Sequence, residues 1–279
     1  MIIWLASYPK SGNTWVRALI SSALYSKDGI YDYENMKKII RFPSKGHFNT
    51  LTKNFFSIKE VSKNWIPAQD LMNLDNKIKI VKTHNALINY MSNRFTNNDN
   101  TCGAIYVVRD PRNVVTSIAN HYDISLNEAK KMLFSHYTSI NYKESQDPSD
   151  MITHIGSWDI HYNSWKLFDK KNFLIIKYED LILDVNSTFN RIIAFLEKFI
   201  KIDINTNKSK KIISSTNFDN LSKLEKEVGF GEAPKNKNNK RVKFFNMGKK
   251  NDWKKLLDKN LAKEISERFE NEMKELGYL

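Results

Sequence analysis

The sequence has only one cysteine, Cys102, in 279 residues. This excludes an intrachain disulfide and fits a reducing compartment. Long hydrophobic runs are missing too, since no stretch approaches the ~20 apolar residues that a membrane-spanning helix needs. The apolar run Ile2–Ala6 is short and has no basic segment before it, unlike a secretory signal. We therefore expect a cytoplasmic protein without a membrane span.

Acidic residues are few relative to basic ones. The chain has 44 Lys and Arg against 31 Asp and Glu, a formal net charge of +13. Such a balance usually indicates an anionic partner: a nucleic acid, a membrane surface or a multiply charged small ligand. A lysine-rich, solvated surface is the alternative interpretation. Charge alone does not choose between these possibilities.

Four short apolar runs predict strands that are buried on both faces. Apolar residues at helical spacing lie between and after these runs. The predicted strands are Ile2–Ala6, Ile78–Val81, Ala104–Val108 and Phe173–Ile176; the helical patterns cover Val16–Leu24, Val114–Ala119, Phe189–Leu196 and Leu257–Leu276. The last pattern predicts one helix that ends at Gly277.

This alternation of strands and helices predicts an α/β fold. We expect a single domain over residues 1–279, with a central parallel sheet flanked by helices. Ligands of such sheets bind at the carboxyl ends of the strands. The residues with suggestive chemistry all follow the predicted strands directly, so we expect them to share one edge of the sheet.

The segment after the first strand has the features of a phosphate-binding loop. It reads Tyr8-Pro9-Lys10-Ser11-Gly12-Asn13-Thr14-Trp15. Gly12 allows close approach of the backbone, and the following amides would lie at a helix N-terminus, where anions are favoured. Lys10 adds a positive charge. The Walker A pattern fails because Asn13 stands where its lysine would be. An ordinary capped turn is the alternative.

The same string resembles the 5′-phosphosulfate loop of the cytosolic-type sulfotransferases, usually Y-P-K-[SA]-G-T-T-W, with Asn13 as the one departure. The resemblance, to a bacterial-like member of the family, implies a P-loop-kinase-like fold. It implies 3′-phosphoadenosine 5′-phosphosulfate (PAPS) as donor, adenosine 3′,5′-bisphosphate (PAP) as product, no metal, and a small acceptor with a hydroxyl or amine. The implied donor contacts in this loop are Lys10, Ser11, Gly12, Asn13, Thr14 and Trp15.

A second anion site is indicated after the third strand. Arg109 ends that strand, and Ser117 follows eight residues later in a predicted helix. A guanidinium can bind a phosphate through two parallel hydrogen bonds. The Arg–Ser pair resembles the 3′-phosphate signature of the family. A structural ion pair of Arg109 with Asp110 or Asp180 is the alternative.

Aromatic and hydroxyl side chains further along the chain resemble those that surround the adenine in the family. Tyr178 lies in Lys177-Tyr178-Glu179-Asp180, which resembles a Y-E-D stretch. Thr216 and Phe218 resemble a T-S-F segment, and Trp15 resembles a base-stacking tryptophan. Each aromatic taken alone is more typical of a core.

The segment Phe244–Lys254 resembles the closing motif F-x-R-K-G-x-x-G-D-W-K through Gly248, Asp252, Trp253 and Lys254. It departs at Asn246 and Met247, which replace the Arg–Lys pair that holds the 3′-phosphate in the family, and at Asn251, which replaces a glycine. The residues that could supply the missing charge are Arg241, Lys243 and Lys249, and the sequence does not choose among them.

Lys82-Thr83-His84 follows the second strand and resembles the K-T-H stretch of the family. Sulfuryl transfer needs a general base for the acceptor proton and fixed positive charge for the leaving oxygen. By the resemblance, His84 is the base, and Lys10 and Lys82 supply the charge. An unperturbed imidazole titrates near neutrality, which suits a base. A structural histidine is the alternative, and for His154 and His161, beside Trp158, helix packing is the favoured interpretation.

Two other functions compete with this one. A P-loop-like nucleotide kinase or NTPase shares the strand-loop-helix arrangement but would need the Walker lysine and a Mg²⁺-binding aspartate. A basic nucleic-acid-binding protein would fit the charge, but the basic stretch Lys235–Lys243 lacks interleaved aromatics. We expect no nucleic acid partner and interpret that stretch either as a mobile flap over the donor or as a merely disordered segment. Ile40–Phe56 and His121–Ser145 are expected to line the acceptor pocket, whereas acceptor identity and oligomeric state are not readable.

Overall fold

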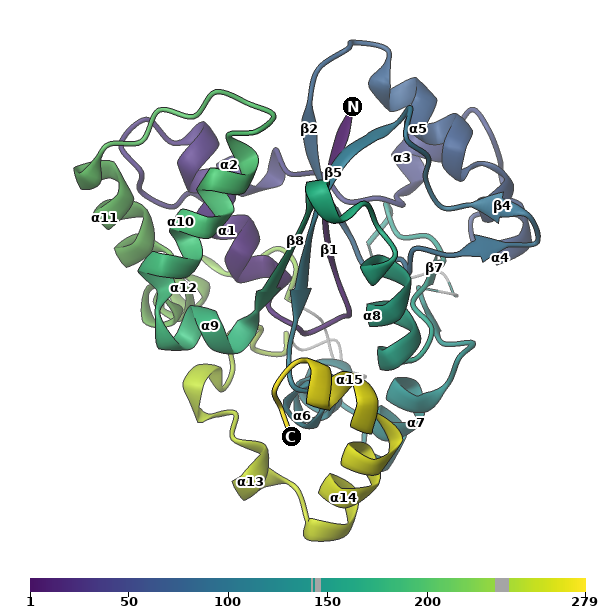
Figure 1. The fold of residues 1–279 in the computed structure, drawn as a ribbon, viewed down its shortest axis with the longest axis vertical. Helices are drawn as coiled ribbons and strands as arrows, with labels where there is room; N and C mark the ends of the chain where they lie inside the picture. Colours follow the sequence, from purple (N-terminus) through teal and green to yellow (C-terminus); the bar gives the residue numbers. More distant parts are fainter. Residues whose placement is uncertain (142, 144–146, 234–240) are drawn as a thin grey trace.

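A computed structural model of the protein describes residues 1–141, 143, 147–233 and 241–279. Its centre is a parallel sheet of four strands in the order β2-β1-β5-β8 (Figure 1). The strands are β1 (Ile2–Ser7), β2 (Lys79–Thr83), β5 (Thr101–Val108) and β8 (Phe173–Lys177). The four strands expected from the apolar runs are thus confirmed, together with the α/β fold.

The sheet is covered by helices on both faces, because alternate residues of each strand point to opposite sides. On β1, Ile3 and Leu5 belong to the core cluster that includes residues of α1 (Asn13–Tyr25) and α10 (Val185–Leu196). Trp4 and Ala6 belong to the other cluster, with residues of α8 (Trp158–Lys166) and the C-terminal helices. Every residue of β1 is buried, so its pattern is continuously apolar rather than alternating.

The remaining elements form the two flanking layers and two small hairpins (Figure 1). They are α2 (Tyr33–Lys37), α3 (Lys45–Phe48), α4 (Ile58–Lys63), α5 (Trp65–Asn73), β3 (Asn89–Tyr90), β4 (Asn93–Arg94), α6 (Pro111–Tyr122), α7 (Leu126–Phe134), β6 (Ser139–Ile140), β7 (Thr153–His154), η1 (Lys170–Asn172), α9 (Tyr178–Leu183), α11 (Thr206–Ser215), α12 (Phe218–Val228), η2 (Gly248–Lys250), α13 (Trp253–Leu256), α14 (Lys259–Arg268) and α15 (Glu270–Glu275).

The prediction of one C-terminal helix over 257–276 is wrong. The Asp258 side chain accepts a hydrogen bond from the amide of Leu261 and caps a new helix, α14, while Leu257 is extended. A second break falls at Phe269, before α15. The apolar positions still face the core, because their spacing is kept across the breaks. Gly277, with φ 70°, follows α15 as expected.

Candidate functional site

A cavity of about 1110 Å³ opens at the carboxyl ends of the strands, where the ligand site was expected. It brings together most of the residues singled out in the sequence. The lining includes Lys10, Gly12, Asn13, Thr14, Trp15, Lys82, His84, Arg109, Ser117, Tyr178, Phe218 and Gly248. Ser11 and Thr216 do not line it: both are fully buried, and the Thr216 hydroxyl donates to the carbonyl of Ile212.

The loop from β1 to α1 needs a glycine at position 12. Gly12 has φ 106°, in the left-handed region, and is the N-cap residue of α1. A Cβ added there would lie 2.5 Å from a ring carbon of Tyr178. The Tyr178 ring also contacts Trp15 edge-on, with centroids 5.8 Å apart. Gly12 therefore allows the loop to pack directly on an aromatic pair at the start of α9 and α1.

Lys10 is half-buried and lies near other cations, with φ 68°. Its Nζ lies 3.1 Å from Nδ1 of His121 and 4.1 Å from the centroid of the Phe244 ring. Burial, with repulsion from Lys82 and Arg109, lowers the pKa of Lys10 to about 7. Burial and Lys10 also lower the pKa of His121 to about 2, so the neutral imidazole accepts from the ammonium. An anion bound here would favour the charged lysine.

His121 is a site residue that the sequence did not single out. It lies near the end of α6 and lines the cavity, within the range 121–145 expected to form the acceptor wall. No spacing signal distinguishes it from the other histidines; only the fold brings it to Lys10. His161, by contrast, is packed in the protein interior, which is the interpretation that the sequence favoured. Its Nδ1 lies 2.8 Å from the Tyr106 hydroxyl and its Nε2 lies 3.1 Å from the carbonyl of His84.

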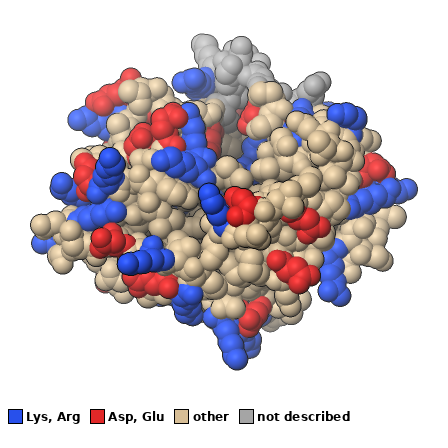
Figure 2. All heavy atoms as spheres, turned by 90° about the horizontal axis from the view of Figure 1, so that it is seen from above, with Lys and Arg blue, Asp and Glu red and all other residues tan. Residues whose placement is uncertain are grey.

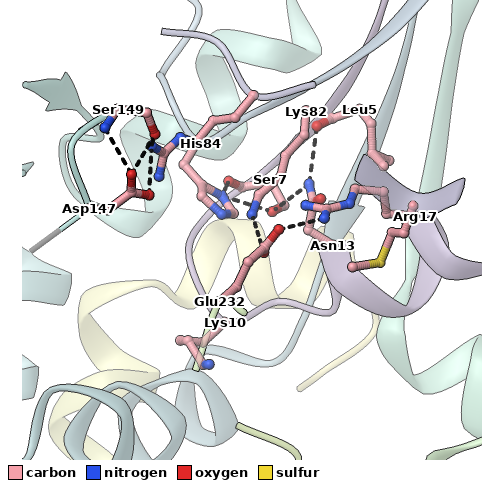
Figure 3. A network of polar contacts seen from close by, with 12 residues as sticks. Leu5, Ser7, Lys10, Asn13, Arg17, Lys82, His84, Asp147, Ser149 and Glu232 are labelled. Carbon is pink, nitrogen blue, oxygen red and sulfur yellow. Dashed lines mark hydrogen bonds and ion pairs between the residues drawn. The ribbon is translucent and has the colours of Figure 1, made fainter. Parts of the chain in front are cut away.

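Asn13 turns its side chain back toward β1 rather than into the cavity (Figure 3). Its Nδ2 donates to the carbonyl of Leu5 at 3.0 Å and to the hydroxyl of Ser7 at 3.2 Å. The residue that departs from the family loop is therefore used for internal hydrogen bonds. Contact with a ligand through its backbone amide, at the start of α1, stays open to it.

His84 is held so that one ring nitrogen faces the protein. Nδ1 lies 2.8 Å from the carbonyl of Ser7 and 3.2 Å from the Ser7 hydroxyl. The carbonyl can only accept, so Nδ1 carries the proton. Burial and the charge of Lys82 lower the pKa of His84 to about 3, so the ring is neutral but is a weaker base than the unperturbed imidazole assumed from the sequence. Nε2 then has a lone pair and, within the described part of the chain, no hydrogen-bond partner.

Lys82 reaches a carboxylate that the sequence did not point to. Its Nζ donates to Oε2 of Glu232 at 3.1 Å, and Arg17 Nη2 donates to Oε1 of the same side chain at 2.5 Å (Figure 3). Burial disfavours the ionised carboxylate, but the charges of Lys82 and Arg17 outweigh it and hold the pKa of Glu232 below its usual range. The three side chains come from β2, the segment after α12, and α1.

Arg109 faces the cavity from the end of β5. Its Nη1 donates to Ser117 Oγ at 3.3 Å and to the carbonyl of Lys10 at 3.5 Å. Its guanidinium carbon lies 4.0 Å from the centroid of the Tyr178 ring. The Nε atom is buried without a partner among the described residues. A buried donor of this kind is costly unless a ligand accepts from it.

The structural alternative for Arg109 is wrong. Asp110 caps α6 and forms its ion pair with Arg112, at 2.7 Å. Asp180 pairs with Arg191 at 3.3 Å. Both carboxylates considered as partners are thus engaged elsewhere, so the Arg109 guanidinium is directed to the loop of Lys10 and to Ser117.

The closing segment uses amides where the family has charges or a glycine. Asn251 Nδ2 donates to Ser117 Oγ at 2.9 Å, and Asn251 Oδ1 accepts from Thr116 at 2.6 Å. Asn246 donates to Asn120 at 2.7 Å. Gly248 has φ 52°, and a Cβ there would lie 2.8 Å from the Phe218 ring. Asn251 therefore orients Ser117, and Gly248 rests on Phe218.

Of the cations considered as substitutes for the family pair, Arg241 packs on the backbone of Gly229, where an added Cβ would lie 2.6 Å from its Nη1. The Lys243 side chain is exposed. The Lys249 side chain lies outside what the structure describes, and so do residues 235–240 of the expected flap.

Residues of the ranges 40–56 and 121–145 also line the cavity. They include the polar side chains of Arg41, His47 and Tyr122 and the apolar ones of Ile40 and Ile140. Arg41 forms ion pairs with Asp150 at 2.7 Å and Asp147 at 3.2 Å. On the face drawn in Figure 2, Lys and Arg are interspersed with Asp and Glu rather than gathered in one basic patch. Across the described residues, no helix is long and apolar enough to cross a membrane.

The model of the sulfotransferase domain family matches residues 2–277. The chain belongs to this family. It is 27% identical over 226 residues to the luciferin sulfotransferase of Photinus pyralis, an alignment that covers 78% of this chain and 56% of that protein. It is 26% identical over 273 residues to human sulfotransferase 1E1, covering 97% of this chain and 83% of the relative. It is also 26% identical to cytosolic sulfotransferase 7 of Arabidopsis thaliana, an alignment that covers 80% of this chain and 64% of that protein.

The fold of the chain is similar to that of solved structures. Mouse sulfotransferase SULT7A1, complexed with PAP, superposes with a TM-score of 0.59 at 20% identity, covering 97% of this chain and 84% of that one. Retinol dehydratase, in a complex with retinol and PAP, superposes with a TM-score of 0.61 at 18% identity, covering 98% of this chain and 81% of that one. The expected P-loop-kinase-like sulfotransferase fold is confirmed.

Proposed function

We propose that this sulfotransferase moves a sulfuryl group from PAPS to a hydroxyl or amine of a small acceptor by in-line displacement, with residues 1–279 acting as one domain. The observation that carries the proposal is the cavity itself. It joins two cationic positions, Lys10 with Lys82 and Arg109 with Ser117, around a neutral histidine. A donor with phosphates at both ends of an adenosine matches two separate cationic positions.

The residues present fit such a donor. Lys10 and the amides at the start of α1 would hold the 5′ end, and Arg109, with its unpartnered Nε, and Ser117 would hold the 3′-phosphate. Trp15, Tyr178 and Phe218 form apolar walls of the same cavity, suited to an adenine. Ser11 and Thr216 do not line the cavity, so we propose that they support the lining residues from behind. Asn13 is proposed to contact the donor through its backbone amide.

His84 acts as the general base in this proposal. Its Nδ1 proton is committed to the Ser7 carbonyl, so Nε2 accepts the proton of the acceptor hydroxyl. Bound PAPS supplies the activated sulfuryl group and the leaving phosphate. Lys10 and Lys82 place positive charge where negative charge grows on the leaving oxygen. The bond from acceptor oxygen to sulfur forms as the bond from sulfur to phosphate oxygen breaks.

The two competing functions gain less support. In a kinase, an aspartate after a strand would hold Mg²⁺, but Asp110 and Asp180 are each paired with an arginine. For nucleic-acid binding, a continuous basic surface is needed, whereas the face in Figure 2 has charges of both signs.

The acceptor is proposed to be a small molecule with both polar and apolar parts, since Arg41 and His47 line the cavity together with Ile40 and Ile140. Retinol dehydratase has been solved with retinol and with androsterone, so relatives of this fold accommodate small organic molecules. A cytoplasmic location is proposed from the single cysteine and from relatives named cytosolic sulfotransferases.

The test is transfer from ³⁵S-labelled PAPS to a panel of hydroxyl and amine acceptors, read by mass spectrometry. A thermal-shift comparison of PAP with ATP and Mg²⁺ accompanies it. We expect a labelled product and stabilisation by PAP alone. Stabilisation by ATP and Mg²⁺ without any by PAP would favour the kinase, and salt-sensitive binding of nucleic acid that survives PAP would favour the third function.

A further inference from the structure

Glu232 is a carboxylate inside a cavity whose other charged groups near the reacting end are cations. Its two oxygens are divided between two partners, with Arg17 on Oε1 and Lys82 on Oε2 (Figure 3). The side chains of Arg17 and Lys82 are 3% and 10% exposed, and that of Glu232 is 30% exposed. A half-buried carboxylate loses part of its hydration, and partners of opposite charge compensate that loss.

Arg17 serves Glu232 and, within the described residues, has no other hydrogen bond. It lies in the first turns of α1, and its side chain is buried with Nε unpartnered. The distance from Arg17 Nη2 to Glu232 Oε1 is 2.5 Å, shorter than the 3.1 Å from Lys82 Nζ to Glu232 Oε2. Arg17 thus fixes Glu232 to the helix that begins at the phosphate loop. The carboxylate has a rigid support although it comes from the irregular segment after α12.

Lys82 needs such a support. Its backbone is fixed, because its amide donates to Ile40 and its carbonyl accepts from Phe42, both at 2.8 Å. The ammonium, however, stands at the end of four flexible methylenes, and Glu232 is its one hydrogen-bond partner among the described residues. A catalytic charge that is not held in place loses much of its effect.

The charges around Lys82 act against its protonation. Burial, Arg17 and Arg41 lower the pKa of Lys82, whereas Glu232 raises it. Lys10, from the phosphate loop, His84, two residues along, and His121, from α6, face the same region. Glu232 also raises the pKa of Lys10, and Glu225 of α12 does the same. Glu232 is the acidic side chain in contact with Lys82, so its removal leaves a surplus of buried cations.

We propose that Glu232 is a positioning residue for sulfuryl transfer: anchored by Arg17, it holds the Lys82 ammonium at the reacting end of the cavity. The inference rests on the proposed function, because Lys82 matters in this way only if a sulfuryl group is transferred there. The competing view is that Glu232 fills the place of a donor anion and must leave before the donor binds.

The decisive variant is Glu232→Gln, which keeps the shape and removes the charge. We expect kcat to fall roughly 10- to 100-fold, as for the loss of a charge-assisted hydrogen bond. At pH 6, where Lys10 keeps its proton, the Kd of PAP should change by less than about threefold, because PAP lacks the sulfuryl group. The alkaline limb of the pH–rate profile should move to lower pH, because Lys82 and Lys10 lose their proton sooner.

Two further variants serve as controls. Glu232→Asp should recover part of kcat, and the exposed control Glu34→Gln should match the wild type.

Two results would overturn the inference. One is an unchanged kcat and pH profile in Glu232→Gln. The other is tighter PAP binding at unchanged kcat, which is the signature of a competing carboxylate. If Arg17 anchors Glu232, Arg17→Met should change kcat and the pH–rate profile in the same direction as Glu232→Gln, but by less. A wild-type kcat and pH–rate profile in Arg17→Met would contradict the anchoring role.

A measurement without turnover separates this inference from the proposed function. The Lys82 side-chain signal, assigned with Lys82→Met, is titrated by NMR in wild type and Glu232→Gln without nucleotide. We expect a lower midpoint in the variant, and equal midpoints would overturn the inference. Absence of sulfuryl transfer by the wild type would instead overturn the proposed function. Far-UV circular dichroism and the melting temperature of each variant establish that it is folded.

Discussion

The side-chain amide of Asn13 donates a hydrogen bond of 3.2 Å to the hydroxyl of Ser7. Ser7 in turn contacts Nδ1 of His84 through both its hydroxyl and its carbonyl. A residue of the proposed phosphate loop is thereby connected to the proposed base through the last residue of β1. This connection gives the one departure in the loop, an asparagine in place of a threonine, a physical role.

The first prediction concerns this connection. Asn13→Ala should lower kcat by about 2- to 10-fold, the worth of one neutral hydrogen bond, because Ser7 and His84 lose their orientation. PAP affinity should stay within about twofold, since the Asn13 side chain points away from the cavity. Ser7→Ala should act through the same path, so the double variant should be less than additive. A large loss of PAP affinity in Asn13→Ala would instead make the side chain a ligand.

The second prediction concerns His84. His84→Ala should leave the Kd of PAP nearly unchanged and lower kcat roughly 10²- to 10⁴-fold, the usual worth of a positioned base. Lys10→Ala should lose both nucleotide affinity and rate, because its charge acts in the ground and transition states. Steady-state kinetics with calorimetry separates the two. If His84→Ala retains most of its turnover at saturating donor, another group takes the proton.

The third prediction concerns Arg109. Arg109→Ala should weaken PAP much more than adenosine 5′-phosphate, because only PAP carries the 3′-phosphate. Losing a hydrogen bond to a charged group costs about 1.5–3 kcal/mol, or roughly 10- to 150-fold in Kd. Ser117→Ala should weaken PAP binding in the same way, but by less. Equal weakening of both nucleotides in calorimetry would remove Arg109 from the 3′-phosphate site.

The fourth prediction follows from the pKa of Lys10, which burial and neighbouring cations lower to about 7. Without ligand, Lys10 is mostly neutral above that pH, and a bound phosphate favours its charged form. PAP binding should therefore take up close to one proton at pH 8.5 and little at pH 6, and affinity should fall as pH rises through 7. Calorimetry in two buffers of different ionisation enthalpy measures the uptake. Lys10→Met should abolish it, and equal uptake in that variant would assign the proton elsewhere.

The fifth prediction concerns metal. Lys10, Lys82 and Arg109 can neutralise the charge that develops during transfer, so turnover should persist in EDTA. Initial rates with and without EDTA, and after added Mg²⁺, provide the measurement. Loss of activity in EDTA that Mg²⁺ restores would support the kinase-like alternative.

Much of the site follows from local sequence. Each of Lys10, Lys82, Arg109 and Tyr178 lies within three residues of the end of a strand, and parallel strands carry such residues to one edge. The C-terminal region shows the limit of this reasoning. Its apolar spacing gave the buried face correctly, but the cap at Asp258 and the break at Phe269 divide the helix.

The sequence by itself determined the parallel α/β fold and the set of strand-end residues, because both depend on periodicity and on short motifs in which neighbours along the chain act together. Only the tertiary structure decided the partners. His121 meets Lys10 across 111 residues, and Glu232 meets Lys82 across 150 and Arg17 across 215. Such pairs leave no periodic trace in the chain. They form because burial makes an uncompensated charge costly, and the fold, not the local sequence, sets which groups can reach it.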